Sequence, residues 1–452
     1  MTKELETTAA PTLEPNVDLD VWGTVKLSHR GDDVDYTTGP LGRAILLLSI
    51  PMVLEMTMES VFALTDAFFV SRLGTDAVAT VGLTEAMVTL LFAVAHGLGI
   101  GTTAMVARRI GERDKPGART AAAQAVLLGI AISAAFAIPG VVFARELLGA
   151  MGGSSELVAS GFGYTRVIFG GSATIVLLFL LNAVFRGAGD AAIAMRVLWI
   201  ANAVNIVLDP CLIFGLGPFP EMGITGAAVA TTVGRGIGVA VQLYVLFFGG
   251  SRIRIAIRHL APRVRVMIRL FRLSVGGMLQ TVISHSSWLV LVWIVGSFGA
   301  AAVAGYTIAI RLVIFALLPS WGLANAAATL VGQNLGAGRP DRAERSAWLA
   351  GILNTVFLLG VAVVFVTAAG PMIRLFSTEA AVVAAGISCL RWVSYGYPFY
   401  AWGMVMVQGF NGAGDTYTPT VINIFCYWLF QLPLAWALAH STGFGATGVF
   451  MA

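Results

Sequence analysis

Five acidic residues lie inside long apolar stretches of the chain: Glu55, Glu59, Asp66, Glu85 and Asp209. If those stretches cross a membrane, each carboxylate costs about 2.5–3.5 kcal/mol to insert, so all five are functional candidates. Two carboxylates held together at low dielectric raise each other's proton affinity. With an amide and a hydroxyl, they also supply the hard oxygen ligands that a small cation prefers. The residue types therefore predict a site for a proton or a sodium ion and leave that choice open.

Helical spacing gathers three of these acids on one face. Glu55, Glu59 and Asp66 are four and seven residues apart, so at about 100° per residue they share one side of a helix. Pro51 lies one turn earlier and removes a backbone hydrogen bond, and we predict a hinge there. Asn205 and its neighbour four residues on, Asp209, share a face of a later helix in the same way.

Some of these residues also have simpler interpretations. Asp66 and Asp209 could cap a helix, or could pair with Arg166 or Arg235 inside the protein. Glu85 could be an acid at a helix end near the outer surface.

Other side chains near the acidic face are weaker candidates. His96 and His285 fall at membrane depth and could handle protons, although a single histidine more often makes a hydrogen bond between helices. Met52, Met56 and Phe62 lie near the acidic face, and flexible or aromatic side chains of this kind suit an adaptable cavity.

The elements that position these residues follow from the composition. The chain has 452 residues, 57% of them hydrophobic and 12% charged, with a mean hydropathy of +0.84. Soluble domains carry about 25% charged residues. This excludes a soluble enzyme, a disordered chain and, because the basic residues lie in short stretches between apolar runs, a nucleic-acid binder. Three cysteines inside apolar runs predict no disulfide framework.

We count eleven apolar runs, each long enough to cross about 30 Å of hydrocarbon as a helix. They are about 43–70, 78–107, 118–144, 157–185, 192–215, 223–248, 267–297, 301–332, 343–370, 381–410 and 417–440. A twelfth begins near Gly445 and stops at Ala452, and we expect the natural protein to continue beyond it. Residues 1–42 carry eight acids and few apolar residues, which predicts a mobile tail.

The lysines and arginines set the orientation. Cytoplasmic loops carry an excess of these residues. With the amino terminus in the cytoplasm, seventeen lie in cytoplasmic loops and three in loops on the opposite side. The bias predicts a cytoplasmic amino terminus. We expect a multi-pass protein of the inner, cytoplasmic membrane.

The chain also repeats itself at a constant separation, which we call the repeat offset. The segment from Phe185 to Asp190 returns as Phe410 to Asp415 with five of six residues identical. Six spans in each half give both halves the same orientation, related by a twofold axis along the membrane normal. We predict an all-α membrane protein of two six-helix bundles: a tail at 1–42, an amino-terminal lobe at 43–250, a basic linker at 251–266 and a carboxy-terminal lobe at 267–452.

The acids do not follow the repeat. The positions that correspond to Glu55, Glu59 and Asp66 hold Gln280, Ser284 and Leu291. All five acids within spans lie in the first half, which predicts a coupling site in one lobe only.

Several motifs, taken together and in order, resemble the MATE (multidrug and toxic compound extrusion) transporters of the MOP flippase superfamily. They are Phe185–Asp190, Asn205–Pro210, Gly223–Thr231, and Asp66 followed by Leu73-Gly74. The resemblance implies twelve helices in two lobes around a central cleft. It also implies a secondary antiporter that exchanges Na⁺ or H⁺ for organic, often cationic, drugs. With no acids within the spans of the second lobe, the chain looks closer to the branch named after the DinF proteins.

The resemblance also implies roles for individual residues. The cation site, which would hold Na⁺ if sodium is the coupling ion, looks like Asp66, Asn205, Asp209 and Thr231. Tyr164 and Asn182 match polar residues that line the family's pocket. We predict that they form the substrate pocket together with Glu59, Phe62 and Met52, which lie on or near the acidic face. Pro51 looks like the proline at which the first helix of the family bends. Glu59 departs from the family, which commonly has a neutral polar residue there.

Other functions fit less well. A flippase for a lipid-linked oligosaccharide precursor is the alternative, but it would call for a strongly cationic cleft and usually fourteen spans. The five histidines are scattered without the spacing of metal ligands, which argues against an intramembrane enzyme. No lysine lies in a phosphate-binding loop, which argues against ATP-driven transport. We expect no cofactor beyond the coupling ion, and as partners a small organic substrate and membrane lipid. We expect no nucleic acid, no ATPase subunit, and a monomer.

Overall fold

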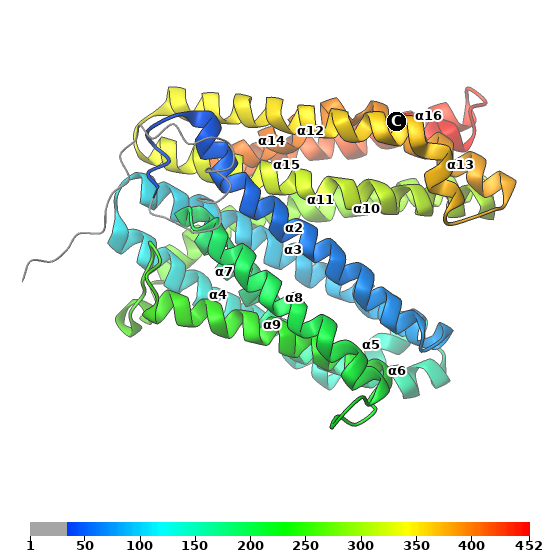
Figure 1. Ribbon diagram of the computed structural model, residues 1–452, viewed down its shortest axis with the longest axis horizontal. Helices are drawn as coiled ribbons and strands as arrows, with labels where there is room; N and C mark the ends of the chain where they lie inside the picture. Colours follow the sequence, from blue (N-terminus) through cyan, green and yellow to red (C-terminus); the bar gives the residue numbers. More distant parts are fainter. Residues whose placement is uncertain (1–33) are drawn as a thin grey trace, which may run out of the picture.

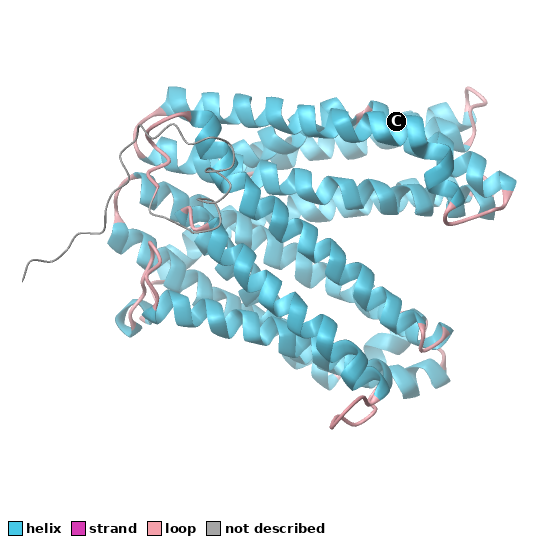
Figure 2. Cartoon of the chain, viewed as in Figure 1, coloured by secondary structure: helices cyan, strands magenta, loops and turns pink. Residues whose placement is uncertain are grey.

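The computed structural model describes residues 34–452, in which every regular element is a helix (Figure 2). In a hydrocarbon medium, helices satisfy every backbone hydrogen bond internally, and this is why long apolar runs fold this way. The amino-terminal lobe holds α2 (Leu41–Ser71), α3 (Thr75–Gly111), α4 (Lys115–Val142), the short α5 (Ala144–Ala150), α6 (Ser155–Gly170), α7 (Ser172–Ala188), α8 (Ala191–Phe214) and α9 (Gly223–Phe248).

The carboxy-terminal lobe repeats this order. It holds α10 (Val264–Gly296), α11 (Ala300–Gly336), α12 (Pro340–Arg374), α13 (Ala380–Tyr395), α14 (Tyr397–Ala413), then α15 (Tyr417–Asn423), a π-helical stretch η2 (Ile424–Gln431) and α16 (Leu432–His440) as one continuous rod, and α17 (Ala446–Met451). Helices α3 and α11, α6 and α13, and α7 and α14 begin and end at positions separated by the repeat offset. The repeat seen in the sequence is therefore a repeat of structure.

Ten stretches in residues 34–452 are long and apolar enough to cross a membrane, and each coincides with one of the predicted runs. The remaining run, 381–410, is divided between α13 and α14 by a break at Gly396. The same break occurs at the corresponding position of the first half, at Gly171 between α6 and α7. The chain is thus an all-α multi-pass membrane protein, and the fourth span of each lobe is a broken helix.

The two lobes lie close together at one end and diverge toward the other (Figure 1). We call the first the closed end; it carries the connections after α3, α7, α9 and α11. There, a β-carbon on Gly111 would overlap the carbonyl of Gln333, and one on Gly336 would overlap the carbonyl of Arg108. Since Gly336 and Gln333 are the repeat partners of Gly111 and Arg108, the contact is reciprocal, as a twofold axis requires.

Residues 34–40, which belong to the tail predicted at 1–42, form a strap across the closed end, and α2 begins at Leu41. The rest of that prediction, at residues 1–33, lies outside the described chain. Tyr36 is 5% exposed and donates a hydrogen bond to the carbonyl of Gly189 in the amino-terminal lobe (3.3 Å). Arg342 of the other lobe donates to the carbonyls of Tyr36 and Thr38. The strap therefore contacts both lobes.

The predicted linker at 251–266 is packed onto the amino-terminal lobe. Ile253 and Ile255 are buried, and a short 3-10 helix, η1 (Ile257–Leu260), follows. The fully buried Gln124 of α4 donates to the carbonyls of His259 and Ala261 and accepts from the backbone N–H of Arg263 (2.7 Å). This fixes the start of α10 against α4.

Candidate functional site

The predicted cation residues of α8 and α9 lie together inside the amino-terminal lobe. Asn205 Nδ2 donates to Thr231 Oγ1 (3.1 Å). Asp209 is 0% exposed, and both of its carboxylate oxygens, together with Asn205 Oδ1, are buried without a hydrogen-bond partner. Buried polar atoms are normally paired because leaving them bare costs free energy. Three bare oxygens beside a hydroxyl fit a small cation or a proton.

Asp66 of α2 also belongs to this group of residues. Its link to them is an electrostatic interaction and not a hydrogen bond. It interacts electrostatically with Asp209 and with Arg235 of α9. Tyr164 of α6 lies within range of both acids and of the guanidinium. The structure therefore brings the four predicted cation residues to one region, which we call the cation cluster, and adds an arginine to it.

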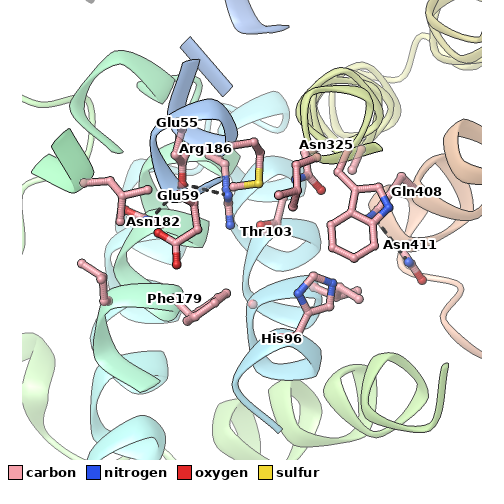
Figure 3. Close-up of a pocket in the computed structure, with 18 of the residues that line it drawn as sticks. Glu55, Glu59, His96, Thr103, Phe179, Asn182, Arg186, Asn325, Gln408 and Asn411 are labelled. Carbon is pink, nitrogen blue, oxygen red and sulfur yellow. Dashed lines mark hydrogen bonds and ion pairs between the residues drawn. The ribbon is translucent and has the colours of Figure 1, made fainter. Parts of the chain in front are cut away.

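A cavity of about 160 Å³ lies between the lobes (Figure 3). Its charged and aromatic lining residues from the amino-terminal lobe are Glu55, Glu59, His96, Phe179, Arg186 and Arg235, and the carboxy-terminal lobe adds Trp321, Asn325, Gln408 and Asn411. Two acids, two arginines and several aromatic and amide groups give it a mixed character. Such a lining suits organic molecules that carry both charged and apolar parts.

An ion pair on the cavity wall is the feature that the sequence did not reveal. Arg186 Nη1 lies 3.2 Å from Glu55 Oε1, and their side chains are 13% and 1% exposed. Asn182 donates to the same oxygen (3.0 Å), and Gln242 donates to Asn182. Arg186 lies in the repeated Phe185–Asp190 motif, and Glu55 was among the acids noted. No spacing rule connects α2 to the end of α7.

The predicted pocket residues divide into three groups. Glu59 and Asn182 line the interlobe cavity, and Glu59 accepts a hydrogen bond from Asn202 (3.3 Å). Phe62 and Tyr164 lie instead inside the amino-terminal lobe, where Phe62 stacks under the guanidinium of Arg235 (5.7 Å). Met52 is 0% exposed. It does not line the cavity, because its backbone abuts Gly322 where α2 packs on α11.

Arg235 connects the cation cluster to the cavity. The sequence suggested Arg235 only as an alternative pairing partner for Asp66 or Asp209. In the structure, Arg235 lines the cavity, lies over the rings of Phe62 and Phe92, and interacts with Asp66. Its place within the apolar run 223–248, one helical turn after Thr231, was the available signal. The guanidinium of Arg235 thus interacts with the cation cluster and also lines the interlobe cavity.

The remaining candidates lie as follows. Pro51 is buried inside α2, which runs through it as one helix. His96 lines the cavity, with its ring 6.3 Å from that of Trp321. His285 is exposed and bonds to the carbonyl of Thr281 on its own helix. Glu85 lies well inside α3 rather than at a helix end.

Comparison with known proteins agrees with this geometry. The model of the MatE family matches residues 51–211 and 278–437, one segment in each lobe. The chain belongs to the MatE family. Among curated relatives, a FAD transporter of Shewanella oneidensis is 27% identical, and the alignment covers 88% of each chain. A probable multidrug resistance protein NorM of Thermotoga maritima is 26% identical, over 90% of this chain and 88% of that protein.

Solved structures extend the match to three dimensions. An outward-facing multidrug resistance MATE transporter of the MOP superfamily superposes with a TM-score of 0.86 and 28% identity, covering 92% of each chain. A MATE transporter in its bent conformation gives 0.84, with 95% of this chain and 92% of that one covered. The MatE fold and the two-lobe arrangement are therefore shared along nearly the whole described chain.

Proposed function

We propose that this MatE protein is a secondary active multidrug efflux antiporter, which exchanges Na⁺ or H⁺ for organic, often cationic, drugs. The observation that carries the proposal is the buried Asp209, whose two carboxylate oxygens have no hydrogen-bond partner. Other residues of the same lobe line the interlobe cavity. A transporter, rather than an enzyme, uses such a site by binding and releasing an ion.

The exchange rests on differential binding. Helix α2 carries Glu59 on the cavity wall and Asp66 in the cation cluster, and Arg235 faces both regions. A cation that neutralises the cluster changes the charge that Arg235 balances, and therefore changes the field in the cavity. If cation and drug each favour a different conformation, the two compete without sharing a site. Pro51, one turn before Glu55, is where α2 would bend.

The proposed setting follows the lysine and arginine bias. The closed end, which carries the strap and the basic connections, lies on the cytoplasmic side of the inner membrane. In the described conformation the space between the lobes therefore widens toward the outside. The protein works as a monomer surrounded by lipid, without an ATPase subunit. Its place in the DinF-like branch stays a prediction that rests on the acids of one lobe.

The test is ethidium uptake into inverted membrane vesicles under an imposed Na⁺ or H⁺ gradient, each applied separately; in such vesicles, export from the cytoplasmic side is uptake into the lumen. Uptake driven by one gradient identifies the coupling ion. Asp66→Asn and Asp209→Asn should each abolish it, whereas Asp76→Asn, an exposed acid at the start of α3, should leave it unchanged. Gradient-driven uptake that persists in both cluster variants would contradict the assignment.

Anionic substrates form a second arm of the same assay. A FAD transporter is among the relatives, and Arg235 brings a positive charge to the cavity lining. Uptake of FAD into inverted vesicles, with no ethidium transport, would move the substrate class to dinucleotides. Transport of neither compound, with movement of a lipid-linked sugar, would favour the flippase alternative.

A further inference from the structure

A second, larger cavity lies at the closed end, where the two lobes meet. It has a volume of about 890 Å³. One side is formed by Arg108, Arg109 and Thr120 of α3 and α4, and the other by the end of the linker and the start of α10, with Arg263, Arg265 and Arg269. We call it the basic pocket. Its walls come from both lobes, so an occupant would touch both.

The charges of the basic pocket do not cancel. Its two acids, Glu112 and Asp114, are already engaged by Arg108 and Arg109 at 3.0–3.2 Å. Within residues 34–452, no acidic oxygen lies within ion-pair distance of the three arginines at the start of α10. Gln124 and the packed linker hold this segment against α4. The pocket therefore presents three exposed guanidinium groups that have no ion-pair partner within residues 34–452.

A separate apolar groove lies between the same two helices, α4 and α10. It has a volume of about 560 Å³ and is lined by Leu128 of α4 and by Met267, Ile268, Phe271, Arg272 and Val275 of α10. Ile268 is 48% and Phe271 is 43% exposed. Leu128 lies two helical turns beyond Ala121 of the basic pocket, about 10 Å deeper along α4. The groove therefore lies between the same helices that help to line the basic pocket, about two helical turns farther from the closed end.

We propose that the basic pocket and the apolar groove together bind one anionic phospholipid. Arginine forks match phosphate oxygens in geometry and charge, and basic pockets between membrane helices bind acidic headgroups. The phosphate would lie among Arg263, Arg265 and Arg269, and an acyl chain would follow Phe271 and Leu128. Because α4 and α10 belong to different lobes, the lipid bridges the seam between them.

Native mass spectrometry of the full chain tests this site with phosphatidylglycerol, phosphatidylcholine and inorganic phosphate as probes. The protein should retain phosphatidylglycerol in preference to phosphatidylcholine. The triple variant Arg263→Gln/Arg265→Gln/Arg269→Gln should lower that retention by at least about tenfold, given about 1 kcal/mol for each basic residue. The matched control is Arg254→Gln/Arg258→Gln/Arg345→Gln, which removes the same charge from exposed sites outside the pocket and should change retention by less than about twofold.

A groove variant separates a lipid from free phosphate and serves if the triple variant does not fold. Leu128→Trp narrows the groove without altering charge, so it should weaken phosphatidylglycerol binding several-fold and leave phosphate binding unchanged. Equal retention of the two lipids by the native chain would overturn the proposal, as would equal losses in the pocket and control triples. Phosphate that displaces all bound lipid, with no effect of Leu128→Trp, would identify a phosphate site instead.

Discussion

The two lobes solve the same packing problem with different chemistry. In the amino-terminal lobe, α2 meets the end of α7 through the Glu55–Arg186 ion pair. At the corresponding positions of the carboxy-terminal lobe, Gln280 and Asn411 exchange two side-chain hydrogen bonds of 3.0 and 3.1 Å. Both contacts join the same two helices of the repeat. Only one of them carries charge.

This difference shows that the charge is not required for packing. A buried ion pair must offset the cost of removing two charges from water, and neutral partners often stabilise a fold as well or better. The amide pair of the carboxy-terminal lobe holds its helices without that cost. Since the ion pair lies on the cavity wall, its charge belongs to the site rather than to the scaffold.

Converting the ion pair in steps should have the largest effect. Glu55→Gln leaves the Arg186 guanidinium buried without its carboxylate, and we expect a loss of about 3–5 kcal/mol in the free energy of unfolding. The double variant Glu55→Gln/Arg186→Asn copies the amide pair of the other lobe and should recover most of it. SDS-induced unfolding of the purified protein measures both.

The reverse change is the control. Gln280→Glu places an unpaired carboxylate in the carboxy-terminal lobe and should destabilise it, whereas Gln280→Glu/Asn411→Arg should recover part of the loss. If the double variant in the amino-terminal lobe is no more stable than Glu55→Gln alone, the two contacts are not equivalent.

The glycines of the closed end should behave alike in the two lobes. Gly111→Ala and Gly336→Ala each push a methyl group into a backbone carbonyl of the opposite lobe, and overpacking of this kind costs about 1–3 kcal/mol. The same unfolding assay should give equal losses for both. Gly82→Ala and Gly403→Ala, where an added β-carbon meets nothing within 4 Å, are the controls. Clearly unequal losses would argue against a twofold seam.

The strap breaks the symmetry of another repeated pair. Tyr36 covers Gly189, whereas the repeat partner Gly414 lines the basic pocket. Tyr36→Phe removes one hydrogen bond and should cost about 0.5–1.5 kcal/mol. Limited proteolysis of the amino-terminal segment should become faster in this variant. An unchanged cleavage rate would show that the hydroxyl does not hold the strap.

The smallest expected effect on the free energy of unfolding concerns Asp415, the aspartate that ends the second copy of the repeated motif. Asp415 accepts hydrogen bonds from the side chain and the backbone N–H of Thr418 (2.6 and 3.0 Å), and these bonds lower the pKa of its carboxyl. A lowered pKa contributes stability above the unfolded value of about 3.9, and that contribution is lost as the pH falls through the folded pKa. Asp415→Asn should cost about 0.5–1 kcal/mol near pH 7.

The pH dependence is the check on that prediction. Unfolding curves of the native protein and Asp415→Asn should differ near pH 7 and converge below about pH 3, where the native carboxyl is protonated as well. A difference that persists at low pH would show that the carboxylate charge is not responsible.

Much of the site followed from local rules. Hydropathy gave the spans, the repeat offset gave the two lobes, and spacing on α8 placed Asn205 beside Asp209. Long-range partners did not follow. Met52 and Glu59 share a helix, yet Met52 is buried against the carboxy-terminal lobe and Glu59 faces the interlobe cavity. Helical periodicity assigns a residue to a face of its own helix and leaves open which neighbour that face meets.

The sequence by itself determined that the chain is a doubled bundle of membrane helices with its buried acids in one half. Length, apolarity and the need to satisfy backbone hydrogen bonds in lipid are properties of each segment. Tertiary structure alone decided that Glu55 pairs with Arg186, that Arg235 faces both the cation cluster and the cavity, and that arginines of both lobes line the basic pocket. Each of these depends on how helices far apart in the chain pack, because burial and charge compensation arise only between surfaces brought together.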